Sequence, residues 1–286
     1  MPIYDLSYRH WPGVPGPRSQ RWVPITWAGL LPLLKKRAFL FWMFLCWSPA
    51  LVAGVFIYLR VSALQGDLSL NAGGLLEANA FFFREFAKWQ LFLYMLTSAF
   101  AGAGLIANDR RTNALQIYLS KPLRPLDYLF GKALTVAAAL GLVTLAPSLA
   151  LYVLRAGLDR QGGYVTSHLL LPFQIVAASA LVIVTMSIIS LAVSSLATSG
   201  RTAGVSLVML YVFSESIRGI LGLLFDRSYI SLLSPVSNLK QGLDWVFGQN
   251  PSFDIHPAVS LVALAVFLAV CAGVVHRRIR PVEVVS

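Results

Sequence analysis

Six long apolar segments alternate with polar segments along the chain. The apolar segments cover residues 38–59, 89–107, 133–154, 169–198, 203–225 and 257–275. Each is long enough for the roughly 20 residues that an α-helix needs to cross a bilayer core of about 30 Å. The sequence lacks the alternating strands of about ten residues that build a membrane β-barrel. We therefore predict an all-α integral membrane protein with six transmembrane helices, in which residues 1–286 form a single transmembrane domain.

The composition excludes a water-soluble fold. Hydrophobic residues make up 57% of the 286 residues and charged residues only 12%, whereas a soluble domain carries about 25% charged residues. The chain has too few polar side chains to cover so large an apolar core. Lipid is therefore the expected solvent for most of its surface.

The distribution of charge predicts how the chain crosses the membrane. If the N-terminus lies inside, the inner segments carry 15 basic and 4 acidic side chains, and the outer segments carry 7 of each. Because Lys and Arg accumulate on the cytoplasmic side, we expect both termini in the cytoplasm and the chain in the plasma (inner) membrane of a prokaryote. The net charge of +11 then faces anionic lipid, so membrane lipid, and not nucleic acid, is an expected partner.

Two segments outside the apolar ones have patterns of their own. Residues 1–37 combine a proline-rich stretch with a part that mixes tryptophans, leucines and basic residues. This predicts a cytosolic arm followed by an interfacial elbow helix, with a plain membrane-proximal linker as the alternative.

Residues 236–247 are amphipathic but too short to span a bilayer. We expect a helical extracytoplasmic segment that either dips into the outer leaflet as a re-entrant hairpin or lies on the surface.

The connection between the second and third apolar segments, residues 108–132, carries most of the functional information. Apolar side chains recur there at the i, i+3, i+4 spacing of a helix, polar residues accompany them, and prolines end the pattern. The apolar residues are Leu115, Tyr118 and Leu119, the polar ones Asp109, Arg110, Arg111 and Gln116, and the prolines Pro122 and Pro125. The predicted short helix either packs on the chain's own spans or docks a soluble partner.

This connection resembles the first cytosolic loop of the permeases of type 2 ATP-binding-cassette exporters. That loop typically reads Glu-x-x-x-Gly-Thr-Leu-Glu-x-Leu-Leu-Ser-x-Pro, with Gly-Lys about nine residues further on. Matching positions are Leu115, Leu119, Ser120, Pro122, Gly131 and Lys132, and the departures include Asp109 for Glu, Asn113 for Gly and Ala114 for Thr. Asp keeps the charge, and Asn tolerates a left-handed backbone. The order of elbow, six spans, loop and outer helix also resembles that family.

The resemblance implies a permease subunit of an ATP-driven exporter, working as a dimer of permease halves with separate cytosolic ATPase subunits. In that family the loop forms a coupling helix that rests on the ATPase. The resemblance therefore implies contact with the ATPase for Asp109, Arg110, Arg111, Leu115, Leu119, Ser120 and Pro122. A membrane anchor or assembly protein that holds a cytosolic partner without transport is the alternative function.

The sequence contains no recognisable motif for catalysis or cofactor binding. No Gly-x-x-x-x-Gly-Lys-[Ser/Thr] occurs, so ATP and Mg²⁺ would be used by a separate chain. The two cysteines give no metal-ligand spacing, and the four histidines lie outside the apolar segments. We expect this chain to bind no cofactor and to be no enzyme.

Glu215 and Arg218 are the charged residues within the apolar segments. At positions i and i+3 they share a helix face and can pair, which lowers the cost of placing charge in lipid. They would line a transport path, hold the outer helical segment, or form a structural pair in which Arg218 reaches outward. An ion-coupled carrier is disfavoured because the spans carry so few ionisable groups.

Overall fold

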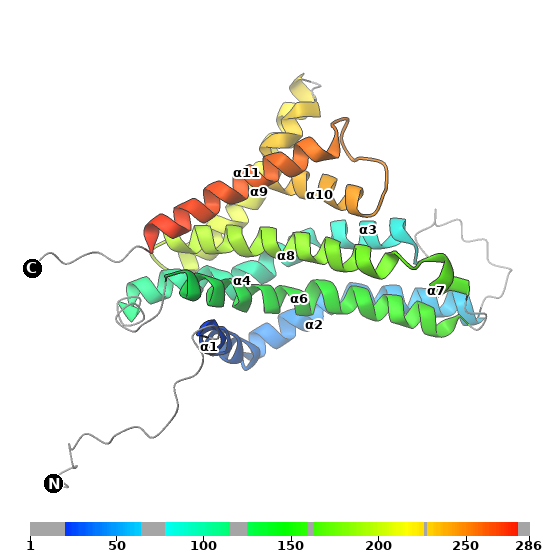
Figure 1. Cartoon of the computed structure of the whole chain (residues 1–286), viewed down its shortest axis with the longest axis horizontal. Helices are drawn as coiled ribbons and strands as arrows, with labels where there is room; N and C mark the ends of the chain where they lie inside the picture. Colours follow the sequence, from blue (N-terminus) through cyan, green and yellow to red (C-terminus); the bar gives the residue numbers. More distant parts are fainter. Residues whose placement is uncertain (1–20, 64–77, 115–124, 160–162, 226–227, 280–286) are drawn as a thin grey trace, which may run out of the picture.

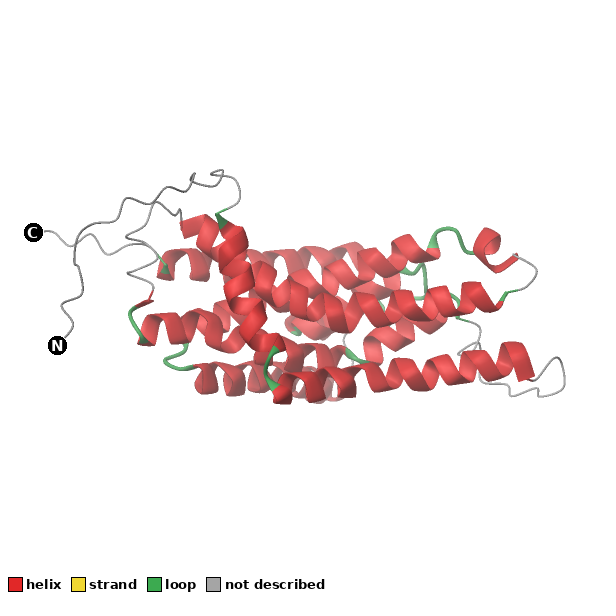
Figure 2. Ribbon diagram, turned by 90° about the horizontal axis from the view of Figure 1, so that it is seen from below, coloured by secondary structure: helices red, strands yellow, loops and turns green. Residues whose placement is uncertain are grey.

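The computed structural model describes residues 21–63, 78–114, 125–159, 163–225 and 228–279. Within these ranges the chain is helical and forms no β-strand (Figures 1 and 2). The α-helices are α1 (Trp22–Leu34), α2 (Arg37–Tyr58), α3 (Ala80–Trp89), α4 (Leu91–Arg111), α6 (Pro125–Leu158), α7 (Gly163–Ser167), α8 (Leu171–Leu196), α9 (Gly200–Phe225), α10 (Pro235–Val246) and α11 (Pro257–Arg278). A π-helical turn, η2 (Leu59–Ala63), extends α2, and a 3₁₀-helix, η3 (Ser228–Leu233), precedes α10.

Six of the described helices are long and apolar enough to cross a membrane: α2 with its extension, α4, α6, α8, α9 and α11. They correspond to the six predicted segments, so the predicted all-α fold with six spans is confirmed. The third helix differs most from its predicted limits, because α6 begins at Pro125 instead of residue 133 and continues to Leu158. With 34 residues it is about 51 Å long. It is therefore longer than a bilayer core of about 30 Å, and its first turn contains Asp127.

The core of the bundle is formed by α4, α6 and α8, which pack against one another (Figure 1). Small residues allow close approach at the contact between α4 and α8. A Cβ atom added at Gly102 of α4 would lie 2.4 Å from Ser190 Oγ of α8. Small interface residues of this kind are typical of helix packing in membranes, where van der Waals contact drives association.

Replacement of Gly102 by alanine is therefore expected to destabilise the protein by about 1–3 kcal/mol, because the added methyl group overpacks the α4–α8 contact. Gly219→Ala on α9 is the matched control, since a Cβ there meets nothing within 4 Å. The free energy of unfolding in detergent measures both effects. Equal stabilities of the two variants would contradict the packing argument.

Helix α1 lies across the bundle. In Figure 1 it is viewed nearly along its own axis, whereas α6 and α8 run lengthwise through the picture. It packs on α6, where Thr26 Oγ1 donates to the carbonyl oxygen of Gly131 at 3.1 Å. A Cβ at Gly131 would lie 2.9 Å from Ile25, so the glycine permits this crossing. A helix is thus present where the elbow was predicted, and its location at the membrane interface stays a prediction.

Helix α10 is buried in the bundle, where it packs against α8, α9, α11 and α3. Its polar residues are buried together with its apolar ones, among them Ser237, Gln241 and Asp244. A Cβ at Gly242 would lie 2.8 Å from Leu181 of α8 and 3.0 Å from Leu261 of α11. The predicted helix between the last two spans is therefore present, packed among its neighbours.

Candidate functional site

The first candidate site lies where α4 ends and α6 begins, which we call the loop end of the bundle. Lys132 Nζ of α6 lies 2.7 Å from Asp109 Oδ2 of α4, and the fully buried Tyr128 donates its hydroxyl to the same oxygen at 2.8 Å. The Lys132 ammonium also stands over the Tyr128 ring, 5.4 Å from its centroid. Only 8% of the Lys132 side chain is exposed, so its buried charge needs compensation, to which Asp109 contributes at close range.

The same turn of α4 is tied to two further spans. Arg110 Nη1 donates to the carbonyl oxygen of Ser195 at the end of α8. Asn108 Oδ1 accepts from the backbone amide of Gly200, the first residue of α9, at 3.3 Å. We call Asn108, Asp109, Arg110, Tyr128 and Lys132 the loop-end cluster. Through it the last turn of α4 is connected to α6, α8 and α9.

One turn earlier, a serine of α8 enters the hydrogen-bond ladder of α4. Ser194 Oγ accepts from the backbone amides of Ile106 and Ala107, both at 3.1 Å, and donates to the carbonyl oxygen of Ala103 at 2.7 Å. Side chains that insert into the ladder are an identified cause of helix bending. Ser194 thus also joins α8 to α4 through hydrogen bonds to the α4 main chain, next to the loop-end cluster.

Three of the predicted coupling residues lie on a span and not in the loop. Asp109, Arg110 and Arg111 form the last turn of α4 and do not belong to a separate loop helix, because α4 continues beyond its apolar part. After Thr112, Asn113 adopts a left-handed backbone with φ of 56°, which ends the helix in the manner of a C-terminal glycine. Asn113 stands where the family pattern has Gly, and its conformation explains why both residues fit.

The other predicted coupling residues lie outside the described residues. They are Leu115, Leu119, Ser120 and Pro122. The second proline, Pro125, is the first residue of α6, a position at which proline costs no helical hydrogen bond. The connection that the family resemblance assigns to coupling thus begins and ends on the two helices that the Asp109–Lys132 pair joins.

A second cluster joins α9 to α10. Glu215 Oε1 accepts from the hydroxyls of Ser234 and Ser237 at 2.7 and 2.8 Å, and Glu215 Oε2 lies 2.8 Å from Lys240 Nζ. Arg218 Nε is 3.6 Å from Glu215 Oε1, a longer contact than these. The predicted Glu215–Arg218 pair is therefore present, but the stronger partners of Glu215 lie on and just before α10.

A third cluster holds the other end of α10. Asp244 is fully buried and accepts from the backbone amide and the hydroxyl of Ser252 at 2.9 and 2.7 Å. It also pairs with Lys88 of α3, and Arg84 Nη1 lies 3.4 Å away. One turn earlier, Gln241 exchanges hydrogen bonds with the backbone of residues 253 and 255. Helix α10 is thus held by charged side chains from both α3 and α9.

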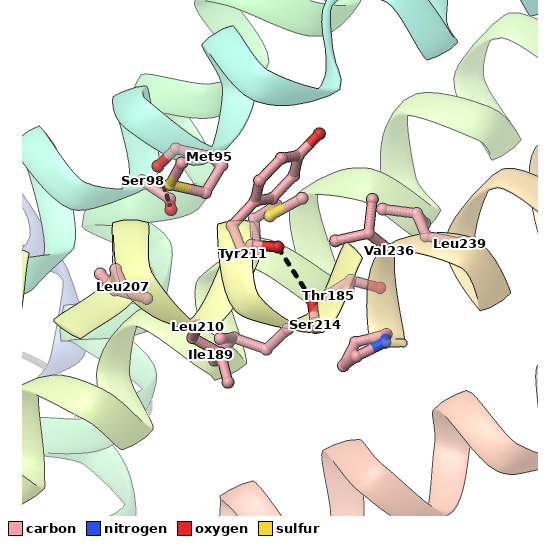
Figure 3. A pocket seen from close by; sticks show the side chains of 12 residues that line it. Met95, Ser98, Thr185, Ile189, Leu207, Leu210, Tyr211, Ser214, Val236 and Leu239 are labelled. Carbon is pink, nitrogen blue, oxygen red and sulfur yellow. Dashed lines mark hydrogen bonds between the residues drawn. The ribbon is translucent and has the colours of Figure 1, made fainter. Parts of the chain in front are cut away.

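A small cavity lies under α10, between α4, α8 and α9 (Figure 3). Its walls are mostly apolar and include Met95, while hydroxyl groups come from Ser98, Thr185 and Ser214. Ser214 donates to the carbonyl oxygen of Tyr211 at 3.0 Å, whereas Thr185 Oγ1 is buried without a hydrogen-bond partner among the described residues. A volume of about 30 Å³ has room for one or two water molecules, so in this conformation the cavity is too small for a cargo.

Together, the six spans and the buried polar clusters between them define a multi-pass helical membrane protein. Residues 40–277 match the family model of the ABC-2 family transporter proteins. This match spans most of the chain, so the chain belongs to the ABC-2 transporter family and is a transmembrane component of such a transporter. A search of curated proteins finds no match. The predicted family is thereby confirmed, and membership implies association with ATPase subunits in general.

Proposed function

We propose that this chain is the permease subunit of an ATP-driven exporter in the plasma (inner) membrane, with both termini in the cytoplasm. Two permease halves, identical or different, form the path, and separate cytosolic subunits bind and hydrolyse Mg-ATP. In this arrangement α1 is the interfacial elbow, and the connection between α4 and α6 is the part of the chain that docks on the ATPase. Helix α10 is the extracytoplasmic segment, held at the outer end of the bundle by Glu215 and Asp244.

The observation that carries this proposal is the loop-end cluster. Movement of an ATPase under residues 115–124 would displace the last turn of α4 and the first turns of α6. Asp109 and Lys132 join these two helices at 2.7 Å, and Arg110 and Asn108 extend the connection to α8 and α9. Energetic coupling between distant sites can be carried by packed side chains and by networks of hydrogen bonds and ion pairs such as this one. The loop end therefore supports a role in transmitting force from a docked partner to four spans.

The test uses the complex that co-purifies with the tagged full-length chain. We expect a soluble ATPase in this complex, and we expect Leu119→Asp and Arg111→Glu to weaken its binding and the ATP-driven turnover. Arg277→Glu is the matched control, because Arg277 is an exposed basic residue near the end of α11. Unchanged complex formation and turnover in both loop variants would overturn the coupling assignment. A co-purified partner without ATP hydrolysis would instead favour the membrane anchor.

A further inference from the structure

The cavity under α10 is bordered by hydroxyl groups from three spans (Figure 3). Ser98 belongs to α4, Thr185 to α8 and Ser214 to α9, and all three line the same space of about 30 Å³. Cavities lined only by apolar side chains stay dry, whereas a cavity needs polar partners and room for at least one molecule to hold water. The cavity under α10 provides both.

Thr185 has a hydroxyl group that the described part of the chain leaves without a partner. The residue is 1% exposed, and its Oγ1 atom is buried and makes no hydrogen bond to any described residue. A buried hydroxyl in this situation is unfavourable, because it has lost its contacts with water and gained none in exchange. Threonine in a helix divides between two χ1 rotamers, so the hydroxyl of Thr185 can turn toward the cavity that its side chain borders.

The four buried threonines of the described helices fall into two pairs. Thr97 and Thr135 each donate to the carbonyl oxygen four residues earlier in their own helix, at 2.8 and 3.1 Å. Thr144 and Thr185 have no partner among the described residues, and each lines a cavity. The cavity beside Thr144 measures about 10 Å³, roughly the room that one water molecule needs. Threonines without a protein partner thus coincide with water-sized cavities.

The two serines of the larger cavity present acceptors to it. Ser98 Oγ donates to the carbonyl oxygen of Met95 at 2.7 Å, and Ser214 Oγ donates to that of Tyr211 at 3.0 Å. The proton of each serine hydroxyl is therefore used within its own helix, whereas the oxygen can still accept. Thr185 can both donate and accept. A water molecule complements this set, because it can accept from the threonine and donate to a serine.

We propose that the cavity under α10 binds one or two water molecules, which accept a hydrogen bond from Thr185 and donate to Ser214 and Ser98. This water joins α9 to α8 and α4 in the half of α9 that is nearer to α10. The buried residues of α9, Ala203 and Leu207, lie in the other half, so apolar burial does not hold this part of the helix. The site does not rest on the proposed function, since it concerns how three spans are joined.

The first test compares the thermal unfolding of the purified full-length chain with that of Thr185→Val, which removes the hydroxyl and keeps the branched shape. If water binds Thr185, the midpoint should fall by about 2–4 °C, the shift expected for the loss of one hydrogen bond in a chain of this size. If the cavity is dry, the variant removes an unsatisfied polar group, and the midpoint should rise. An unchanged or higher midpoint would overturn the water site.

Ser187→Ala is the matched control for this substitution. Ser187 lies on the same helix, and its Oγ is also buried without a partner among the described residues, but it does not line the cavity. Its replacement should leave the midpoint unchanged or raise it. An equal fall in both variants would show that the loss reflects packing within α8, which also overturns the proposal.

Radiolytic oxidation of the native chain tests the site without any substitution. Met95 and Met186 line the cavity and are only 3% and 4% exposed. Brief X-ray exposure forms hydroxyl radicals from bound water, so both methionines should be oxidised. Cys46 is the control, because it is 0% exposed and does not line the cavity. Absence of oxidation at both methionines, or equal oxidation of Cys46, would overturn the water site.

Discussion

Replacing the buried Asp244 by alanine is expected to lower the free energy of unfolding by about 3–5 kcal/mol, the usual cost of removing one partner of a buried ion pair. Asp244 is fully buried in α10 and is the closer acidic partner of Lys88, whose Nζ also lies 3.9 Å from Glu85 Oε1. The alanine would remove this carboxylate from Lys88 and Arg84, and it would remove the acceptor of the two hydrogen bonds that Ser252 donates. Unfolding in detergent, followed by tryptophan fluorescence, measures the loss.

Asp254→Ala is the control for this experiment. Asp254 lies ten positions further along the same connection, but it is exposed, so its removal should change stability by less than about 0.5 kcal/mol. The double variant Asp244→Leu with Lys88→Met should lose less than Asp244→Ala, because fewer unpaired charges stay buried. A loss below 1 kcal/mol for Asp244→Ala would mean that Lys88 and Arg84 reach water when the carboxylate is absent.

The spans were predictable because hydrophobic length is a local property of the sequence. The boundaries of the third span were less predictable, because α6 continues through Asp127 and Lys132 as a regular helix. Helix formation does not stop where the bilayer ends, and Lys132 is accommodated because Asp109 lies on the neighbouring helix. Apolar runs therefore report the thickness of the lipid, whereas helix ends are set by residues such as Pro125 and Asn113.

The contacts of the candidate sites were harder to foresee. Glu215 and Arg218 were identified because charge within an apolar segment is conspicuous, and their i, i+3 spacing predicted the pair. Lys240 is the closer partner of Glu215. It lies in a segment whose amphipathic spacing resembles that of a helix on a membrane surface. Nothing in its own neighbourhood indicates that α10 packs among α8, α9 and α11. Amphipathic spacing cannot distinguish a helix on a membrane surface from one whose polar face meets charges from other spans.

Asp109 and Lys132 illustrate both the use and the limit of the motif. Both match or nearly match positions of the family pattern, and the sequence alone treats them as the two ends of one loop. The structure shows an ion pair between α4 and α6 at 2.7 Å. The side chain of Asp109 also accepts a hydrogen bond from the hydroxyl of Tyr128. Their proximity depends on the extension of both helices beyond the apolar core, which the apolar pattern does not report.

Under the proposed function, Lys132→Met is expected to uncouple the permease from the ATPase while leaving the complex assembled. The variant keeps most of the apolar stem but removes the cation that joins α6 to the last turn of α4. Stimulation of ATP hydrolysis by the permease, relative to the isolated ATPase, should fall about tenfold, within the range of coupling free energies between sites. Lys132→Arg should keep most of the stimulation, and Lys35→Met, at an exposed lysine after α1, should keep all of it. Full stimulation in Lys132→Met would show that movement reaches the spans without the Asp109–Lys132 pair.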